Sequence, residues 1–235
     1  MHLIAWGSSL LLTLGIVHYP AEADAQTRIL PRSTAFWVTA GLAVASTALV
    51  DERIRTASLA NRSSTLDALA DAGNQLGTGR NIIGALALTY IGARVLHRKP
   101  LADGVLRVAA GYAVSNAIVG VLKPVVGRHR PDSTNDAWRF DPFSSDGSWH
   151  SFPSSHSVHA FSLSAGVAMT SRRPWLQALA YTEASVVAWS RVYNDQHWTS
   201  DVTTSAVIGI ATAATTLEWL DRRFPPRQHT TGASR

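Results

Sequence analysis

Residues 104–122 read GVLRVAAGYAVSNAIVGVL, a stretch of Ala, Val, Leu, Ile and Gly that carries one charged residue, Arg107. Its length, and the absence of polar residues at every second position, favour an α-helix over a β-strand. Five further stretches have the same character, at residues 34–50, 81–97, 156–170, 175–190 and 201–219. The sequence therefore predicts an all-α fold, a six-helix bundle.

The composition of the 235-residue chain is that of one apolar domain. Hydrophobic residues make up 46% of it and charged residues only 16%, compared with roughly 25% charged residues in an ordinary soluble domain. A chain of this length can bury one substantial core. We expect the bundle to be embedded in a membrane, although most of the six stretches are shorter than the roughly 20 residues of a typical span. A soluble, unusually apolar bundle is the alternative.

The charged residues and the absence of cysteine exclude several function classes. The net charge is +5, but the cations are scattered singly or in pairs such as Arg172-Arg173. No Lys/Arg-rich run suggests a nucleic-acid partner. Because the chain has no cysteine, it has no disulfide framework, thiolate nucleophile or cysteine-ligated zinc.

The two ends of the chain differ from the middle. Residues 1–25 hold an apolar run and then small residues around Ala23 and Ala25, which predicts a secretory signal peptide or an additional N-terminal membrane segment. We assign residues 26–222 to one helical domain. Residues 223–235, which include Pro225 and Pro226 among polar residues, are expected to form a disordered tail.

The basic residues also predict an orientation in a membrane. If the six helices alternate in direction, one side receives most of the short basic segments: Arg28, Arg32, Arg98, Lys99, Arg172, Arg173, Arg222, Arg223 and Arg227. By the positive-inside rule this side is cytoplasmic. A cleaved signal peptide would instead place the new N-terminus outside, so cleavage, six spans and this orientation cannot all hold.

Three polar clusters interrupt the apolar stretches, and the first reads KPVVGRHRP over residues 123–131. Because its prolines and glycine disfavour a helix, we expect the preceding helix to end here and Lys123 and Arg130 to converge on a bent segment. A planar guanidinium and a compact ammonium are suited to binding phosphate. Taken alone, this cluster is equally consistent with a basic turn beside a membrane.

The second cluster, SFPSSHS over residues 151–157, directly precedes an apolar stretch. A serine cap there leaves backbone N–H groups free at the helix start, where an anion can bind. His156 would lie beside that anion and could donate a proton to a leaving oxygen. Taken alone, an ordinary serine cap with an incidental histidine explains the cluster better.

The third cluster reads SRVYNDQHWTSD over residues 190–201. His197 and Asp201 are four residues apart, so on a helix they would share a face and the carboxylate could accept a proton from one imidazole nitrogen. The other nitrogen would then be free to act as a nucleophile. For this pair alone, a surface His–Asp pair is the simpler interpretation.

In this order and with this spacing, the clusters resemble the superfamily of type 2 phosphatidic acid phosphatases, bacterial class A acid phosphatases and vanadium haloperoxidases. Its signature is Lys-x6-Arg-Pro, then Pro-Ser-Gly-His, then Ser-Arg-x5-His-x3-Asp. The matching residues are Lys123, Arg130, Pro131, Pro153, Ser154, His156, Ser190, Arg191, His197 and Asp201. Ser155 stands where the family usually has glycine, so it could crowd the anion or donate to it.

The resemblance covers most of residues 34–219 and implies a metal-independent phosphatase without a cofactor. By this resemblance His197 forms a phosphohistidine, Asp201 orients it, and His156 protonates the departing oxygen. The residues implied to bind the phosphate oxygens are Lys123, Arg130, Ser154, Ser155 and Arg191. The orientation above would place them on the periplasmic side of a bacterial inner membrane.

The substrate and the setting leave alternatives open. A membrane-embedded bundle suggests phosphorylated lipids, whereas a soluble bundle suggests a periplasmic acid phosphatase acting on small phosphate esters. A vanadium haloperoxidase is a less favoured alternative. Vanadate would be a cofactor only in that case and is otherwise expected to inhibit. An inactive membrane scaffold is disfavoured because every expected catalytic side chain is present.

Overall fold

The structure, a computed structural model, describes residue 31 and residues 33–171 and 173–225. This described part contains eight α-helices, two 3-10 helices (Pro131–Ser133 and Gly147–Trp149) and an isolated bridge between Arg128 and Phe140, but no β-strand. The helices are α2 (Thr34–Ala48), α3 (Asp51–Ala60), α4 (Ser64–Leu76), α5 (Gly79–Val95), α6 (Lys99–Val126), α7 (Ser155–Thr170), α8 (Pro174–Tyr193) and α9 (Thr199–Arg223). The all-α prediction is confirmed. The expectation for residues 1–25 lies outside the described residues, and so does that for the tail at 223–235 except for its first three residues, of which Arg223 ends α9.

Helices α3 and α4 occupy the connection between residues 51 and 80, where no apolar stretch predicts a helix. Helix α3 begins with Asp51 and Glu52, whose charges favour the positive end of the helix dipole. Helix α4 begins after Ser63, whose hydroxyl accepts the N–H of Leu66 at 3.3 Å and so caps the helix. The bundle therefore has two helices more than the six that were predicted, and those six match the apolar stretches.

Helix α6 ends differently from the prediction. It continues through Pro124 to Val126 and ends at Gly127, which has a left-handed φ of 57°. A Cβ atom on residue 127 would collide with the backbone carbonyl of Asp141, so only glycine fits here. Lys123 consequently lies in the last turn of a helix rather than on a bend.

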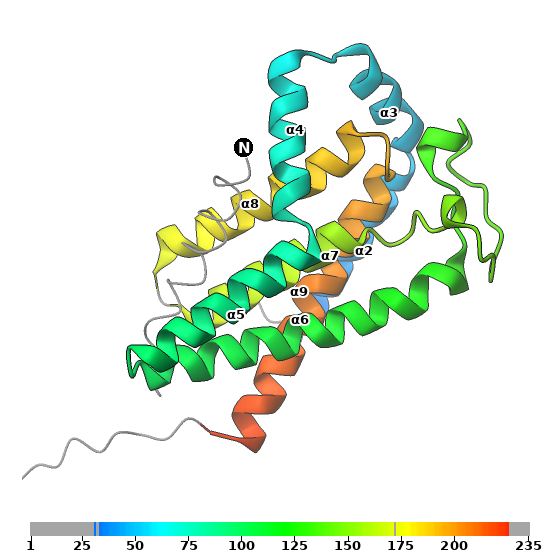
Figure 1. Ribbon diagram of the computed structural model, residues 1–235. Helices are drawn as coiled ribbons and strands as arrows, with labels where there is room; N and C mark the ends of the chain where they lie inside the picture. The colour runs from blue at the N-terminus through cyan, green and yellow to red at the C-terminus, as the bar shows by residue number, and fades with distance from the viewer. Residues whose placement is uncertain (1–30, 32, 172, 226–235) are drawn as a thin grey trace, which may run out of the picture.

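Helices α6, α7, α8 and α9 alternate in direction (Figure 1). The C-terminal ends of α6 and α8 therefore lie at the same end of the bundle as the N-terminal ends of α7 and α9. Helix α7 is central, because it packs against α6, α8 and α9. Helix α3 packs on α8 and α9, and α4 packs on α8.

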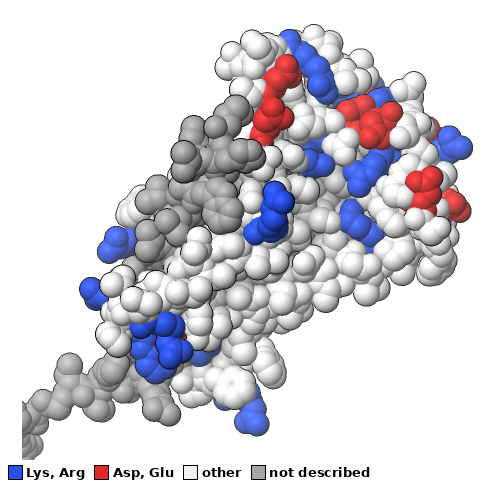
Figure 2. All heavy atoms as spheres, in the orientation of Figure 1, with Lys and Arg blue, Asp and Glu red and all other residues white. Residues whose placement is uncertain are grey.

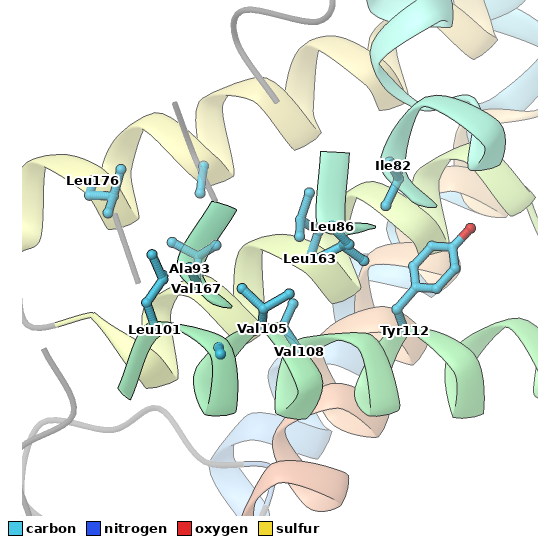
Figure 3. Packing of buried hydrophobic residues seen from close by; sticks show 12 residues of the cluster. Ile82, Leu86, Ala93, Leu101, Val105, Val108, Tyr112, Leu163, Val167 and Leu176 are labelled. Atoms are coloured by element: carbon cyan, nitrogen blue, oxygen red, sulfur yellow. The ribbon is translucent and has the colours of Figure 1, made fainter. Parts of the chain in front are cut away.

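The main core lies between α5, α6, α7 and α8 (Figure 3). Its largest members are Ile82, Leu86, Leu101, Val105, Val108, Tyr112, Leu163, Val167 and Leu176. Gly166 allows α7 to approach α6, since a Cβ there would lie 2.9 Å from Cγ1 of Val108. Each fully buried aliphatic side chain contributes roughly 1.5–3 kcal/mol to folding, so this cluster holds the four helices together.

Large apolar side chains also cover the outside of the bundle. They include Trp37, Val38 and Leu42 on α2, Ile83, Leu88 and Ile91 on α5, and Leu106, Val114 and Val121 on α6. Exposed apolar patches can mark surfaces that contact a membrane, a ligand or another protein. Within the described residues, α6 alone is long and apolar enough to cross a membrane, and α2 with α3 passes the same test only as a pair bent by 59°.

Candidate active site

The three polar clusters meet at one end of the bundle. Lys123 is in the last turn of α6, Ser154 caps α7, Arg191 is in the last turn of α8, and Asp201 is in the first turn of α9. These helix ends lie toward the right and upper right of Figure 1. Figure 2 shows Asp and Glu side chains gathered toward the same end, among Lys and Arg.

Lys123 and Arg130 converge on one backbone carbonyl. The Nζ of Lys123 donates to the oxygen of His150 at 2.7 Å, and Nη2 of Arg130 approaches the same oxygen at 3.4 Å. Nη1 of Arg130 also donates to the carbonyl oxygen of Gln196 at 3.1 Å. Arg130 is therefore adjacent to the loop that carries His197, and the structure brings the first and third clusters together.

The second cluster forms the start of α7. The hydroxyl of Ser154 accepts the N–H of Ser157 at 3.4 Å, and the N–H of Ser154 donates to the hydroxyl of Ser205 on α9 at 2.8 Å. Ser154 is completely buried, whereas Ser155 is half-buried in the first turn of α7. The first amides of a helix have no intrahelical partner, so the N–H groups of Ser155 and His156 are suited to bind an anion.

Arg191 links α8 to α4. One terminal nitrogen of its buried guanidinium donates to the side-chain oxygen of Asn74. Its buried Nε has no hydrogen-bond partner among the described residues. Because an unpaired buried donor is costly, this nitrogen is suited to an anion that enters the site.

His197 lies in the loop before α9 and not on a helix. Its Nδ1 is 3.7 Å from Oδ2 of Asp201, which is ion-pair distance but too long for a hydrogen bond. Both side chains are almost completely buried. With Nδ1 on the side of the carboxylate, Nε2 is the nitrogen that can face a substrate.

The environment of His197 keeps it uncharged. Burial lowers the pKa of His197 to about 3, and the cations of Lys123 and Arg130 add to this, while Asp201 opposes it. The imidazole is therefore neutral at physiological pH and retains the lone pair that a nucleophile needs.

His156 completes this group from the first turn of α7. Lys123, Arg191 and His197 are all close enough to interact with it electrostatically. The turn between α4 and α5 packs on its other side, where a Cβ on Gly77 would lie 3.0 Å from the His156 Cβ. His156 is half-buried, and its burial together with the nearby cations of Arg191 and Lys123 lowers its pKa to about 3. An anionic phosphate in the site would oppose this lowering and favour the protonated ring.

Arg128, Asp51 and Ser200 form a buried network that the sequence analysis did not single out. Arg128 donates to Oδ1 of Asp201 at 2.6 Å and to Oδ2 of Asp51 at 2.9 Å. Ser151 donates to Oδ2 of Asp201 at 2.6 Å. Arg128 lies inside the first cluster, so its position offered a signal. Asp51 is remote in sequence, and nothing local marks it.

Across residues 33–171 and 173–225, no group of three or more His, Asp or Glu side chains is arranged to hold a metal ion. Lys123, Arg130 and Arg191 bring three cationic side chains to this end of the bundle.

The family follows from the region that contains these residues. The family model of the PAP2 superfamily matches residues 104–225, just over half of the chain, and this range includes all three polar clusters. The chain belongs to the PAP2 superfamily. The resemblance seen in the sequence motifs is thereby confirmed.

Known proteins similar to this PAP2 chain include a lipid A 1-phosphatase of Porphyromonas gingivalis. The two are 35% identical over 104 residues, which are 43% of this chain but only 20% of that protein. The chain thus spans about one fifth of the curated relative that it matches.

Two crystal structures share the PAP2 fold of this chain. The first transmembrane PAP2-type phosphatidylglycerolphosphate phosphatase from Bacillus subtilis has a TM-score of 0.64 at 21% identity, covering 83% of this chain and 98% of that one. LpxE from Aquifex aeolicus has a TM-score of 0.55 at 20% identity, covering 75% of this chain and 95% of that one. At these identities the likeness is one of fold.

Proposed function

We propose that this PAP2 protein is a phosphatase that hydrolyses phosphate monoesters or pyrophosphates of lipids through a phosphohistidine intermediate. The observation that carries the proposal is a buried His197 whose Nδ1 lies 3.7 Å from the carboxylate of Asp201 and which interacts electrostatically with Lys123 and Arg130. A neutral imidazole beside a carboxylate can act as a nucleophile, and nearby cations attract and polarise a phosphate.

In the first step, Nε2 of His197 attacks phosphorus. A phosphorus–nitrogen bond forms while the bond from phosphorus to the ester oxygen breaks. His156, whose protonated form is favoured by the negative charge of the bound phosphate, gives its proton to that oxygen. Lys123, Arg130 and Arg191 bind the remaining phosphate oxygens, with Nε of Arg191 as an available donor. The negative charge of Asp201 stabilises the positively charged imidazole ring of the intermediate.

In the second step, His156 removes a proton from water. The water oxygen then bonds to phosphorus as the phosphorus–nitrogen bond breaks, which releases inorganic phosphate and restores neutral His197. The amides of Ser155 and His156 at the start of α7 stabilise the same oxygens in both steps. Ser154 holds these amides in place as the helix cap. No step of this scheme requires a metal or another cofactor.

The proposed lipid substrate is supported by the outside of the bundle. Exposed apolar residues on α2, α5 and α6 are suited to contact acyl chains, and α6 has the length and composition of a span. The site lies at the C-terminal end of this span, so a phosphorylated headgroup could reach it from the membrane surface. The names of the relatives, a lipid A 1-phosphatase and a phosphatidylglycerolphosphate phosphatase, are consistent with this class.

The proposed location is a bacterial inner membrane with the site on the periplasmic side. Helix α6 begins beside Arg98 and Lys99, and α9 ends with Arg222 and Arg223. Both of these basic helix ends lie at the end of the bundle opposite the site. By the positive-inside rule they would face the cytoplasm.

A substrate panel on the full-length protein in detergent tests the proposal. We expect release of inorganic phosphate from phosphatidate, phosphatidylglycerol phosphate or a polyprenyl pyrophosphate to exceed release from a small ester such as p-nitrophenyl phosphate. The His197→Ala variant should release none. Preference for the small ester would favour a broad-specificity acid phosphatase instead, and hydrolysis that survives in His197→Ala would exclude the phosphohistidine scheme.

A further inference from the structure

Arg128 connects two buried carboxylates that come from opposite parts of the chain. Its side chain is 5% exposed, and those of Asp51 and Asp201 are 0% exposed. Asp51 is the first residue of α3, and Asp201 is in the first turn of α9. The guanidinium also donates to the carbonyl oxygen of Ala137 at 3.0 Å from Nε and at 2.8 Å from Nη2.

The contacts on Asp201 fix which oxygen faces His197. Arg128 occupies Oδ1, whereas Oδ2 accepts from the Ser151 hydroxyl at 2.6 Å and from the backbone N–H of Trp198 at 3.0 Å. Oδ2 is also the oxygen that lies 3.7 Å from Nδ1 of His197. The carboxylate is therefore held from several directions and cannot rotate away from the imidazole.

Asp51 holds Arg128 in turn. One of its oxygens accepts from the backbone N–H of Ser200 at 2.8 Å, and the other accepts from Arg128 and from the Ser200 hydroxyl. That hydroxyl also accepts from Nη1 of Arg128 at 2.7 Å. Asp51, Ser200 and Arg128 thus form a closed set of hydrogen bonds directly behind Asp201.

The charges of this network do not cancel. Two carboxylates and one guanidinium leave one negative charge in an environment that excludes water. A buried pair of this kind is not by itself a strong source of stability. Its negative charge, however, lies next to the imidazole that becomes positive when it carries a phosphoryl group.

We propose that Arg128 and Asp51 are positioning residues, which orient Asp201 toward His197 and set the charge that His197 experiences. The inference rests on the proposed function, because it concerns the nucleophile of that reaction. It predicts a defect in the chemical step, while substrate binding by Lys123, Arg130 and Arg191 remains largely intact.

The first test compares Arg128→Lys with Arg139→Lys, an exposed position of the same loop. Lysine keeps the charge of residue 128 but cannot reach several acceptors with one planar group. We expect kcat of Arg128→Lys to fall on the order of 10- to 100-fold, as for a displaced catalytic group, with KM changed much less. Arg139→Lys should match the unmodified protein in both constants.

The second test changes the charge of the network. If Asp51 and Arg128 had a purely structural role, the sign of the charge removed would not decide the direction in which the pH profile moves. The groups facing His197 are Lys123 on α6, Arg130 after it, His156 on α7 and Asp201 on α9. Asp51→Asn removes one negative charge behind Asp201, so the imidazolium is stabilised less and the acid limb of kcat/KM should move to lower pH. Arg128→Gln removes a positive charge, so the limb should move to higher pH.

The outcomes separate this inference from the proposed function. Phosphatase activity that is lost in His197→Ala but normal in both kcat and pH profile in Arg128→Lys and Asp51→Asn would overturn the positioning role alone. Absence of phosphatase activity in the unmodified protein would overturn the proposed function. If the Arg128 variants fail to fold, Ser200→Ala decides: we expect a lower kcat at unchanged KM, and unchanged kcat would contradict the inference.

Discussion

Gly77 packs directly against His156: a Cβ on residue 77 would lie 3.0 Å from the His156 Cβ and 3.1 Å from its Cδ2. The backbone of Gly77 is right-handed, with φ of −79°, so glycine is needed here for space and not for its conformation. The turn between α4 and α5 thereby sets the position of the proposed acid.

Gly77→Ala should therefore lower activity without strain in the backbone. The added methyl group must displace His156 or Val187, which lies 2.5 Å from the same position, and misplacing a catalytic group can cost on the order of 100-fold in rate. Steady-state kinetics on the purified variant checks this. Gly92→Ala, in α5 with no atom near its added Cβ, is the matched control. Equal kcat in the two variants would contradict the role of Gly77.

Arg191→Lys should reduce kcat/KM strongly although it keeps the charge. Arg191 uses one terminal nitrogen on Asn74 and keeps a buried Nε available, whereas a lysine has a single nitrogen for both tasks. Losing one donor to the transferred phosphoryl group costs roughly 100-fold. Arg98→Lys, at the exposed start of α6, controls for a general Arg-to-Lys effect. Kinetics of Arg191→Lys within twofold of those of the control would refute this role.

His156→Ala should separate the two steps of the reaction. With p-nitrophenyl phosphate the leaving group needs no proton, so His197 can still be phosphorylated in the variant. The water of the second step, however, has lost its general base, and general acid–base catalysis typically contributes about 100- to 10,000-fold to the rate. We expect an initial burst of nitrophenol and an acid-labile phosphoenzyme that accumulates. Quench-flow with labelled substrate measures both. Rapid turnover without accumulation would assign the base to another residue.

Most helices of this fold are visible in the sequence because their apolar residues are continuous. Residues 104–122, for example, contribute Val105, Val108 and Tyr112 to the main core. An apolar stretch of this kind can be recognised from the sequence alone. Helices α3 and α4 were not predicted, because charged and small residues interrupt their apolar residues. Their stability comes from packing on α8, which a local pattern does not reveal.

The site residues, like the helices, were predictable from the sequence only in part. The spacing of His197 and Asp201 predicts that they pair, and they do lie 3.7 Å apart. They reach this distance differently from the prediction, because His197 precedes the helix and Asp201 lies in its first turn. Asp51 was not predictable, since its contact with Ser200 depends on how α3 packs against α9, and its contact with Arg128 joins it to the segment after α6.

The low pKa of His197 predicts how stability changes with pH. Burial holds that pKa at about 3 in the folded protein, whereas an unfolded histidine titrates near 6.5. Between these values the unfolded chain binds more protons, so the stability associated with neutral His197 is complete above a pH of about 6.5 and is lost as the pH falls toward about 3.

Melting temperatures in detergent at pH 7, 6 and 5 test this effect. The unmodified protein should lose more stability over this range than His197→Gln, which has no proton to take up. His97→Asn is the control, because residue 97 is exposed and asparagine tolerates its φ of 53°. The same pH dependence in the unmodified protein and in His197→Gln would show that folding does not lower the pKa of His197.

Chelation and vanadate test whether protein cations alone supply the positive charge of the site. The proposed scheme assigns the binding of the phosphate oxygens to Lys123, Arg130 and Arg191, so EDTA should leave kcat unchanged. Orthovanadate should inhibit competitively, because a five-coordinate vanadate resembles the transition state that these cations stabilise. Initial rates with and without each reagent measure both effects. Activity that EDTA removes and Mg²⁺ restores would show that the three cations are insufficient, and vanadate-dependent halide oxidation in place of inhibition would favour the haloperoxidase alternative.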